Sequence, residues 1–219
     1  MVTEGSSGTD VPYLRAALAA SAALPAATKR AVLSRGLLGP TVQWLIRRNL
    51  NGVYADDDYL SPKAHPVAFA PGALNERALV KAAHALKPDE VPPVAVLTPL
   101  AVRQSIGLAA RPKFFAATPC AVGVAFHSTD LVRTIPFRAS AGGPRVSFGR
   151  TTWRVVRGDP ARVTFSPGAE PDVTEITLDC RGLTGRVDVA CFAKDLGTEW
   201  GAPSFVSFCL AEGEWGGKR

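Results

Sequence analysis

The sequence predicts a mainly β protein with a helical N-terminal part, in which the β part is an antiparallel sandwich of the jelly-roll kind, or a barrel, of about 8–10 short strands. Two observations carry this prediction. Over residues 11–87, apolar residues recur at helical spacing. After residue 93, short β-branched and aromatic runs are separated by glycine and proline, with no helical pattern between them.

The first part, residues 1–93, is expected to form a helical arm or subdomain. Its first helix should cover Val11–Ala23, where leucines and alanines recur at helical spacing. The next should run from Pro25 to about Leu38, because the pair Gly39-Pro40 is expected to stop it. The sequence thus places a break between helices at this pair.

A third helix is expected to begin at Thr41, which can cap it, and to end before an acidic loop over residues 51–73. A fourth helix should cover Leu74–Lys87, where Pro88 terminates it. Residues 87–93 then connect the helical part to the β part.

The second part, residues 94–219, is expected to be the β domain. Alternation is clear in some runs, and the run Cys120–His127 is apolar on both faces, which is typical of a central strand. Pro136 is expected to place its strand at an edge or in a bulge. The expected strands are Val94–Thr98, Phe114–Thr118, Cys120–His127, Leu131–Arg138, Arg145–Phe148, Thr151–Arg157, Ala161–Phe165, Val173–Asp179, Arg186–Ala193 and Ser204–Leu210.

The distribution of charge within the β part is uneven. The formal net charge of the chain is +6. Residues 103–162 contain ten basic residues and two acids, whereas residues 163–217 contain three basic residues and nine acids. A basic segment makes phosphate backbones and acidic protein surfaces the expected partners.

Nine of the ten basic residues in that segment are arginines, whose planar guanidinium group binds phosphate or carboxylate through two hydrogen bonds. In one interpretation the basic strands face nucleic acid. In another the basic segment pairs with the acidic one, within a molecule or between copies, and in a third the charges are only the solvated faces of strands. For the first interpretation, the predicted nucleic-acid-binding residues are Arg47, Arg48, Arg133, Arg138, Arg145, Arg150, Arg154, Arg157 and Arg162.

No catalytic motif is present in the sequence. The chain lacks a G-x-S-x-G nucleophile elbow, a phosphate-binding G-x-x-x-x-G-K-[ST] loop and a zinc-binding H-E-x-x-H helix. Cys120 and His127 are seven residues apart and would point to opposite faces of a regular strand. An enzyme would have to use carboxylates or a single cysteine as the reactive group, and the sequence does not rank Asp159, Asp179 and Asp188. We therefore expect no catalytic residue.

The triplet Asp56, Asp57 and Asp58 is the one candidate for a cation site. Adjacent carboxylates alone make a poor cage, so we expect an acidic surface loop, no metal and no cofactor. The four cysteines lie in apolar runs without zinc-site spacing, which favours buried thiols in a reducing compartment, with one or two disulfides as the alternative. These cysteines are Cys120, Cys180, Cys191 and Cys209.

The start of the chain does not have the pattern of a secretory signal. The apolar run Ala16–Ala27 is preceded by Glu4 and Asp10, and the first basic residue is Arg15. No apolar run reaches the length of about 20 residues that a transmembrane helix needs. We expect an intracellular protein that is not secreted and has no membrane partner.

Taken together, these features favour a structural, self-assembling protein over an enzyme. A basic, helix-containing N-terminal part before an antiparallel β-sandwich is the architecture of many small viral coat (capsid) proteins, and this likeness rests on no motif. Residues 1–50, with six basic residues and two acids, are less arginine-rich than such arms often are. We expect a homo-oligomer that contacts RNA, in a virion or in the host cytoplasm. The alternatives are a non-catalytic subunit of a larger ribonucleoprotein, phage or cellular assembly, and an enzyme on a β-sandwich scaffold.

Overall fold

The computed structural model describes residues 11–64, 71–100, 113–126, 132–142, 150–182, 185–194 and 200–210. It is mainly β with helices in the N-terminal part, so the predicted fold class is confirmed. The chain divides into two compact units, which are described separately here. Unit 1 comprises Met1–Ala95, Ala141–Thr152 and Phe192–Pro203, and unit 2 comprises Val96–Ser140, Trp153–Cys191 and Ser204–Arg219. The predicted domain boundary after residue 93 stays a prediction.

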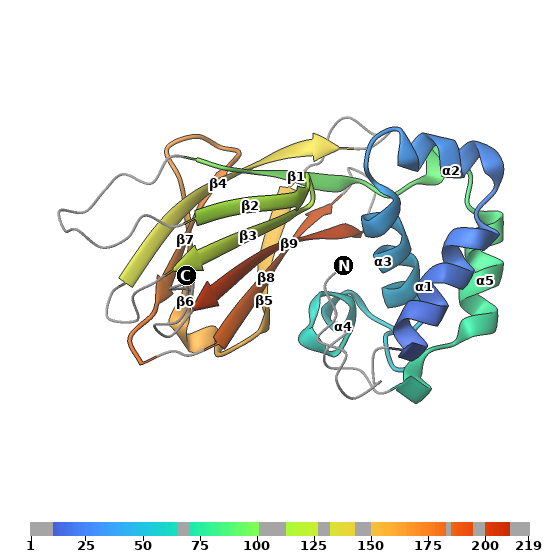
Figure 1. Ribbon diagram of the computed structural model, residues 1–219, viewed down its shortest axis with the longest axis horizontal. Coiled ribbons are helices and arrows are strands. Elements are labelled where there is room, and N and C mark those ends of the chain that lie inside the picture. Colours follow the sequence, from blue (N-terminus) through green and yellow to red (C-terminus); the bar gives the residue numbers. More distant parts are fainter. Residues whose placement is uncertain are drawn as a thin grey trace, which may run out of the picture. The chain divides into compact units, whose positions relative to one another are not determined.

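Unit 1 contains the α-helices of the described chain. In Figure 1, α1, α3 and α5 lie side by side, and the structure brings each of these helices into contact with the other two. None of the described helices is long and apolar enough to cross a membrane. The α-helices are α1 (Val11–Ala23), α2 (Ala26–Leu33), α3 (Leu38–Arg48), α4 (Asp56–Leu60) and α5 (Glu76–Ala85).

Several helix boundaries differ from the prediction. The second helix ends at Leu33 instead of near Leu38, and the fourth predicted helix is shorter than Leu74–Lys87 by two residues at each end. Gly39 and Pro40 do not separate two helices, because they lie in the first turn of α3. A proline is tolerated there, since the first N–H groups of a helix have no partner within the helix. The first bond of α3 runs from the N–H of Thr41 to the carbonyl oxygen of Leu37 at 3.0 Å. In addition, the predicted acidic loop contains the short helix α4.

The strands of the described residues confirm most of the predicted runs. Only the predicted strand Arg145–Phe148 lies outside the described residues. The run expected to begin at Ala161 begins two residues later, because a 3₁₀ turn capped by Asp159 precedes it. The strands are β1 (Val94–Pro99), β2 (Lys113–Thr118), β3 (Ala121–Phe126), β4 (Val132–Gly142), β5 (Arg150–Arg157), β6 (Val163–Pro167), β7 (Val173–Asp179), β8 (Gly185–Lys194) and β9 (Trp200–Leu210).

These nine strands of the described residues form one sheet with a branched order. The main path is β2-β3-β9-β1-β4-β7-β6, while β8 pairs with β9 and with β5. The sheet is mixed instead of wholly antiparallel, because β9 runs parallel to both β1 and β3. Strand β3 has two neighbours, so the predicted central position of the run Cys120–His127 is confirmed for its described residues.

Pro136 does not mark an edge strand, contrary to the prediction. Strand β4 lies between β1 and β7. The carbonyl oxygen of Pro136 accepts a hydrogen bond from the N–H of Leu100 at 2.9 Å. The N and the carbonyl of one residue point to the same side of a strand. The missing N–H of Pro136 therefore faces the end of β1, and the β4–β7 ladder is complete without it.

The core of unit 2 is built from alternating residues of its strands. Phe137 on β4 is fully buried, and its ring contacts those of Trp153 on β5 and Phe208 on β9, with centroid distances of 6.3 and 6.5 Å. Phe165 on β6 stacks on Trp153 at 6.3 Å. Aromatic contacts of this kind add to the burial of apolar area and connect four strands.

In unit 1, the first residues of β9 approach another backbone segment very closely. The N–H of Ala202 donates to the carbonyl oxygen of Pro93 at 2.9 Å. A Cβ atom at Gly201 would lie 2.0 Å from the same carbonyl oxygen. Only a residue without a side chain fits between these two segments, which explains the glycine at this position.

We expect Gly201→Ala to lower the free energy of unfolding by about 1–3 kcal/mol, because the backbone of Pro93 has to move away from the new methyl group. Urea unfolding followed by circular dichroism measures this change. The matched control is Gly39→Ala, where nothing lies within 4 Å of the added Cβ atom. Equal midpoints for the two variants would contradict the close approach.

Candidate nucleic-acid interface

The nine arginines predicted to bind nucleic acid do not form one group in the structure. They differ in burial, in partner and in the unit to which they belong. In unit 1 are Arg47, Arg48 and Arg150, and in unit 2 are Arg133, Arg138, Arg154, Arg157 and Arg162. The ninth, Arg145, lies outside the described residues.

Arg47 is in the core of unit 1 and is only 1% exposed. Its Nη2 donates hydrogen bonds to the carbonyl oxygens of Tyr59 and Ser61. Its Cζ lies 5.1 Å from the ring centroids of both Tyr59 and Phe192. Burial lowers the pKa of Arg47 to about 10, so the group is charged at neutral pH. Because it is enclosed, we leave Arg47 out of the candidate interface.

Arg48 is half-buried at the rim of the same aromatic group. Its Cζ lies 5.9 Å from the ring centroid of Trp44 and 5.1 Å from that of Tyr59. Trp44 and Arg48 are four residues apart on α3, which is the spacing at which helical side chains meet. The aromatic contact of Arg48 was therefore visible in the sequence, although we did not predict it.

Arg138 joins the basic segment of the chain to the acidic one within unit 2. Its Nη2 lies 2.5 Å from Oε2 of Glu170, and its Nε lies 3.1 Å from Oδ2 of Asp172. The antiparallel pairing of β4 with β7 places these charges side by side, since Arg138 is opposite Val173. At this position the basic segment therefore pairs with the acidic segment within one molecule, as the second interpretation of the charge distribution proposed.

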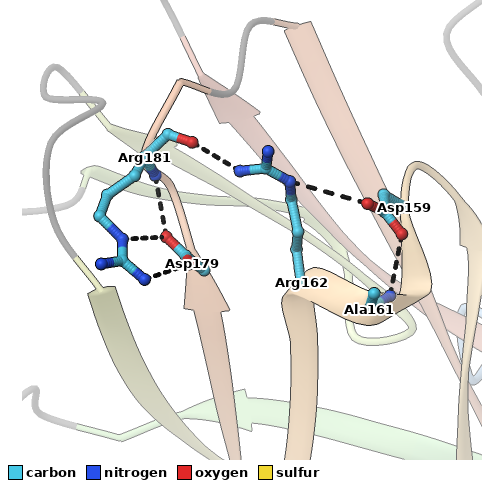
Figure 2. Close-up of polar contacts among 5 residues, drawn as sticks. All are labelled: Asp159, Ala161, Arg162, Asp179 and Arg181. Carbon is cyan, nitrogen blue, oxygen red and sulfur yellow. Dashed lines mark hydrogen bonds and ion pairs between the residues drawn. The ribbon is translucent and has the colours of Figure 1, made fainter.

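Arg162 connects two turns at one end of β6 and β7, as Figure 2 shows. Its Nε lies 3.7 Å from Oδ2 of Asp159, and its Nη1 donates to the carbonyl oxygen of Arg181 at 2.5 Å. Asp159 also accepts a hydrogen bond from the N–H of Ala161 at 3.0 Å. The Arg162 side chain therefore already has protein partners, which a phosphate group would have to displace.

The second pair in Figure 2 is Asp179 with Arg181. Nε and Nη2 of Arg181 donate to the two carboxylate oxygens at 2.9 and 2.6 Å, and the Arg181 N–H donates at 3.0 Å. The hydrogen bonds from the Arg181 side chain are the main reason that the pKa of Asp179 lies well below its usual range. This carboxylate stays ionised and bound to arginine.

Asp188, the third carboxylate considered for catalysis, is buried on β8. Its Oδ1 accepts a hydrogen bond from Nε of Arg186 at 2.6 Å, and Nη2 of Arg186 donates to Oγ of Ser207 at 3.0 Å. Arg186 and Asp188 are two residues apart and so share a face of the strand. Each of the three acids that the sequence did not rank is therefore paired with an arginine.

Three of the nine predicted arginines lie on β5. Arg150 and Arg154 are exposed, and Arg157 is half-buried, as is Arg133 on β4. Among the described strands, β5 pairs only with β8, so it forms an edge of the described sheet. Strand β5 thus carries the arginines that are best placed to meet a phosphate group from solvent.

A cluster of charged side chains surrounds the ring of Trp200 in unit 1. Cζ of Arg150 lies 5.6 Å from the ring centroid, and Nζ of Lys194 lies 4.9 Å from it. Oδ2 of Asp56 accepts a hydrogen bond from Nε1 of Trp200 at 3.1 Å and lies 3.6 Å from Nζ of Lys194. The sequence indicated Arg150, but it did not indicate Lys194 or Asp56 as its neighbours.

The aspartate triplet does not converge on one point. Asp56 faces Trp200 and Lys194, whereas Asp58 lies 4.0 Å from Nζ of Lys63 and accepts a long hydrogen bond from the N–H of Tyr54. Within the described parts of the chain, no three His, Cys, Asp or Glu residues form a group able to hold a metal ion.

The thiols are in apolar surroundings. Cys120, Cys180 and Cys191 are buried, Cys209 is half-buried, and none of them forms a disulfide. Burial raises the pKa of Cys180 to about 11, and it also raises that of Cys120 and Cys191. A thiol with a raised pKa is a poor nucleophile. His127, the other half of the pair considered in the sequence, lies outside the described residues.

Comparison with known proteins adds no functional assignment. No family model matches the chain, and no curated protein sequence matches it.

We expect Arg47→Ala to lower the free energy of unfolding by about 2–5 kcal/mol, because it leaves a cavity between two rings and removes the donor to the buried carbonyl group of Tyr59 and the half-buried one of Ser61. Urea unfolding followed by circular dichroism measures the loss. Arg35→Ala is the control, since Arg35 is exposed and its replacement should cost at most about 0.5 kcal/mol. Similar losses in both variants would show that Arg47 is not a core residue.

We expect Arg181→Gln to raise the pKa of Asp179 toward the ordinary value of about 3.9. The pKa of Asp179 is lower in the folded chain than in the unfolded chain. The ion pair therefore contributes stability above about pH 4 that is lost as the pH falls. The chemical shift of the Asp179 carboxyl carbon, followed by NMR as the pH is changed, gives the midpoint of its titration. Arg162→Gln should raise the pKa of Asp179 less than Arg181→Gln does, because Arg162 acts on Asp179 through its charge and not through a hydrogen bond. An unchanged midpoint in Arg181→Gln would refute the assignment.

Proposed function

We propose that the protein is a structural, self-assembling protein of the small viral coat (capsid) type that contacts RNA and acts in a virion or the host cytoplasm. The observation that carries the proposal is that β5, an edge of the described sheet, carries Arg154 and Arg157 in unit 2. Arg154 is exposed and Arg157 is half-buried, and because they are three residues apart they point to opposite faces of the strand. Arginine at an exposed strand edge both discourages strand pairing with other chains and binds phosphate.

Burial and position narrow the proposed RNA contact. Arg47 is buried and is left out of it, and Arg138 and Arg162 would have to leave the carboxylates that they already contact. In unit 2 the proposed contact residues are Arg154, whose Nη1 also donates to the carbonyl oxygen of Trp153 at 3.0 Å, and Arg157. Their contacts would be mainly to phosphate, so they would provide affinity without sequence preference.

Exposed apolar side chains on the helices support self-assembly. On α1, Val11 is 58% exposed and Leu18 is 72% exposed, and on α2 Leu33 is 55% exposed. Val11 and Leu18 are seven residues apart, which places them on one face of α1. Large apolar side chains that share one face of a surface helix are typical of a contact with another protein surface. In this proposal that surface belongs to a second copy of the chain.

Mass photometry of the purified protein, with and without single-stranded RNA, tests the proposal directly. We expect oligomers, and an affinity for RNA that falls steeply between low and moderate salt, because binding releases counterions. The double variant Arg154→Ala/Arg157→Ala should bind RNA about 25-fold more weakly at 0.1 M salt, since two phosphate contacts are lost. Its circular dichroism spectrum should not change.

The control is Arg30→Ala/Arg35→Ala, which removes two exposed charges from the helical part. This variant should bind RNA nearly as well as the wild type. A protein that stays monomeric at high concentration with and without RNA would refute the assembly proposal. RNA affinity that is insensitive to salt would refute the arginine contact.

A further inference from the structure

Unit 1 contains a cation that is held against an aromatic ring. Arg150 is exposed, its guanidinium group contacts the ring of Trp200, and it forms no ion pair with a carboxylate among the described residues. A guanidinium group that lies on an aromatic ring still has its N–H donors in its own plane, available to an anion. The aromatic contact also restricts the side chain, which reduces the entropy lost when an anion binds.

Lys194 supplies a second cation at the same ring, but a carboxylate opposes it. Its Nζ lies 4.9 Å from the Trp200 ring centroid and 3.6 Å from Oδ2 of Asp56. Asp56 is itself fixed, because it also accepts the hydrogen bond from Nε1 of Trp200. Among the described residues, the cluster therefore contains two cations and one carboxylate, and the surplus positive charge is on the exposed side chain of Arg150.

The ring that carries these groups is rigidly held. Trp200 is buried, and its carbonyl oxygen accepts a hydrogen bond from Nε1 of Trp44 on α3 at 3.2 Å. A buried ring cannot stack on a base, so the cluster is not a base-binding platform. Its available chemistry is that of a fixed cation, which suits a singly charged group with two free oxygens, such as the phosphodiester of an RNA backbone.

We propose that Arg150 and Lys194, positioned by Trp200, form a preorganised site for one RNA phosphate, and that Asp56 weakens this site by neutralising Lys194. This inference rests on the proposed function and adds to it a contact in unit 1, distinct from Arg154 and Arg157. It assigns opposite effects to two neighbouring side chains. Removal of Arg150 weakens RNA binding, whereas removal of the charge of Asp56 strengthens it.

The test measures binding of a single-stranded homopolymeric RNA at several salt concentrations. Arg150→Gln should weaken binding about 5-fold at 0.1 M salt and lower the slope of log affinity against log salt by about 0.7, as expected for one lost phosphate contact. Asp56→Asn should tighten binding by up to about 5-fold, because it leaves Lys194 as a second cation. Asn keeps an oxygen that can accept the hydrogen bond from Trp200.

Two controls match these changes in net charge. Arg35→Gln removes one exposed cation from the helical part, and Asp57→Asn removes one exposed acid next to Asp56. Arg150→Gln must weaken RNA binding more than Arg35→Gln does. Asp56→Asn must strengthen RNA binding more than Asp57→Asn does. A loss of fold in Arg150→Gln would be seen by circular dichroism, and Asp56→Asn then decides the proposal by the sign of its effect.

The outcomes separate this site from the function on which it rests. A wild-type protein that does not bind RNA would overturn the proposed function and this site with it. RNA binding that is weakened by Arg154→Ala/Arg157→Ala but is equal in Arg150→Gln and Arg35→Gln would overturn this site alone. If Arg150→Gln changed the oligomer mass and left RNA affinity unchanged, the anion would be an acidic surface of a second copy, and the RNA assignment would be wrong.

Discussion

The start of strand β9 is the constraint on which unit 1 depends. The carbonyl oxygen of Trp200 accepts a hydrogen bond from Trp44 on α3, and that of Gly201 accepts one from the hydroxyl group of Tyr59 on α4. The next N–H, that of Ala202, donates to Pro93. Three consecutive residues are thus fixed by three separate segments, and the absence of a side chain at Gly201 allows the approach. The same residues hold the ring of Trp200 against its two cations.

Arginine has three different structural uses in this chain, and its environment decides which one applies. Arg47 is enclosed by rings and carbonyl groups, which stabilise a buried cation. Arg138 neutralises acids beside a neighbouring strand. Arg150 is exposed, and its guanidinium group lies on an aromatic ring. Part of the positive charge of residues 103–162 is therefore cancelled inside the molecule.

The sequence predicts helices and strands better than it predicts which side chains contact one another. Val11–Ala23 and Val173–Asp179 have the predicted bounds, because apolar spacing within a segment reports which face is buried. By contrast, the burial of Arg47 depends on the ring of Phe192, far away in the chain. The pairing of Arg138 with Glu170 and Asp172 likewise depends on strand register, and the turn of α3 at Gly39-Pro40 depends on local geometry that composition does not reveal. A site made of distant residues, such as Asp56 and Lys194, has no signature in local sequence.

The anchoring of β9 also bears on the order in which the protein can be made. The bonds from Trp44 to Trp200 and from Tyr59 to Gly201 join residues separated by 156 and 142 positions. The helices of unit 1 leave the ribosome before strand β9, the segment that completes their core. Until β9 follows, their partner surfaces are open, and closing such long loops is slow. During translation, the helices of unit 1 are therefore available to a chaperone, or to another nascent chain on the same messenger, before β9 can cover them.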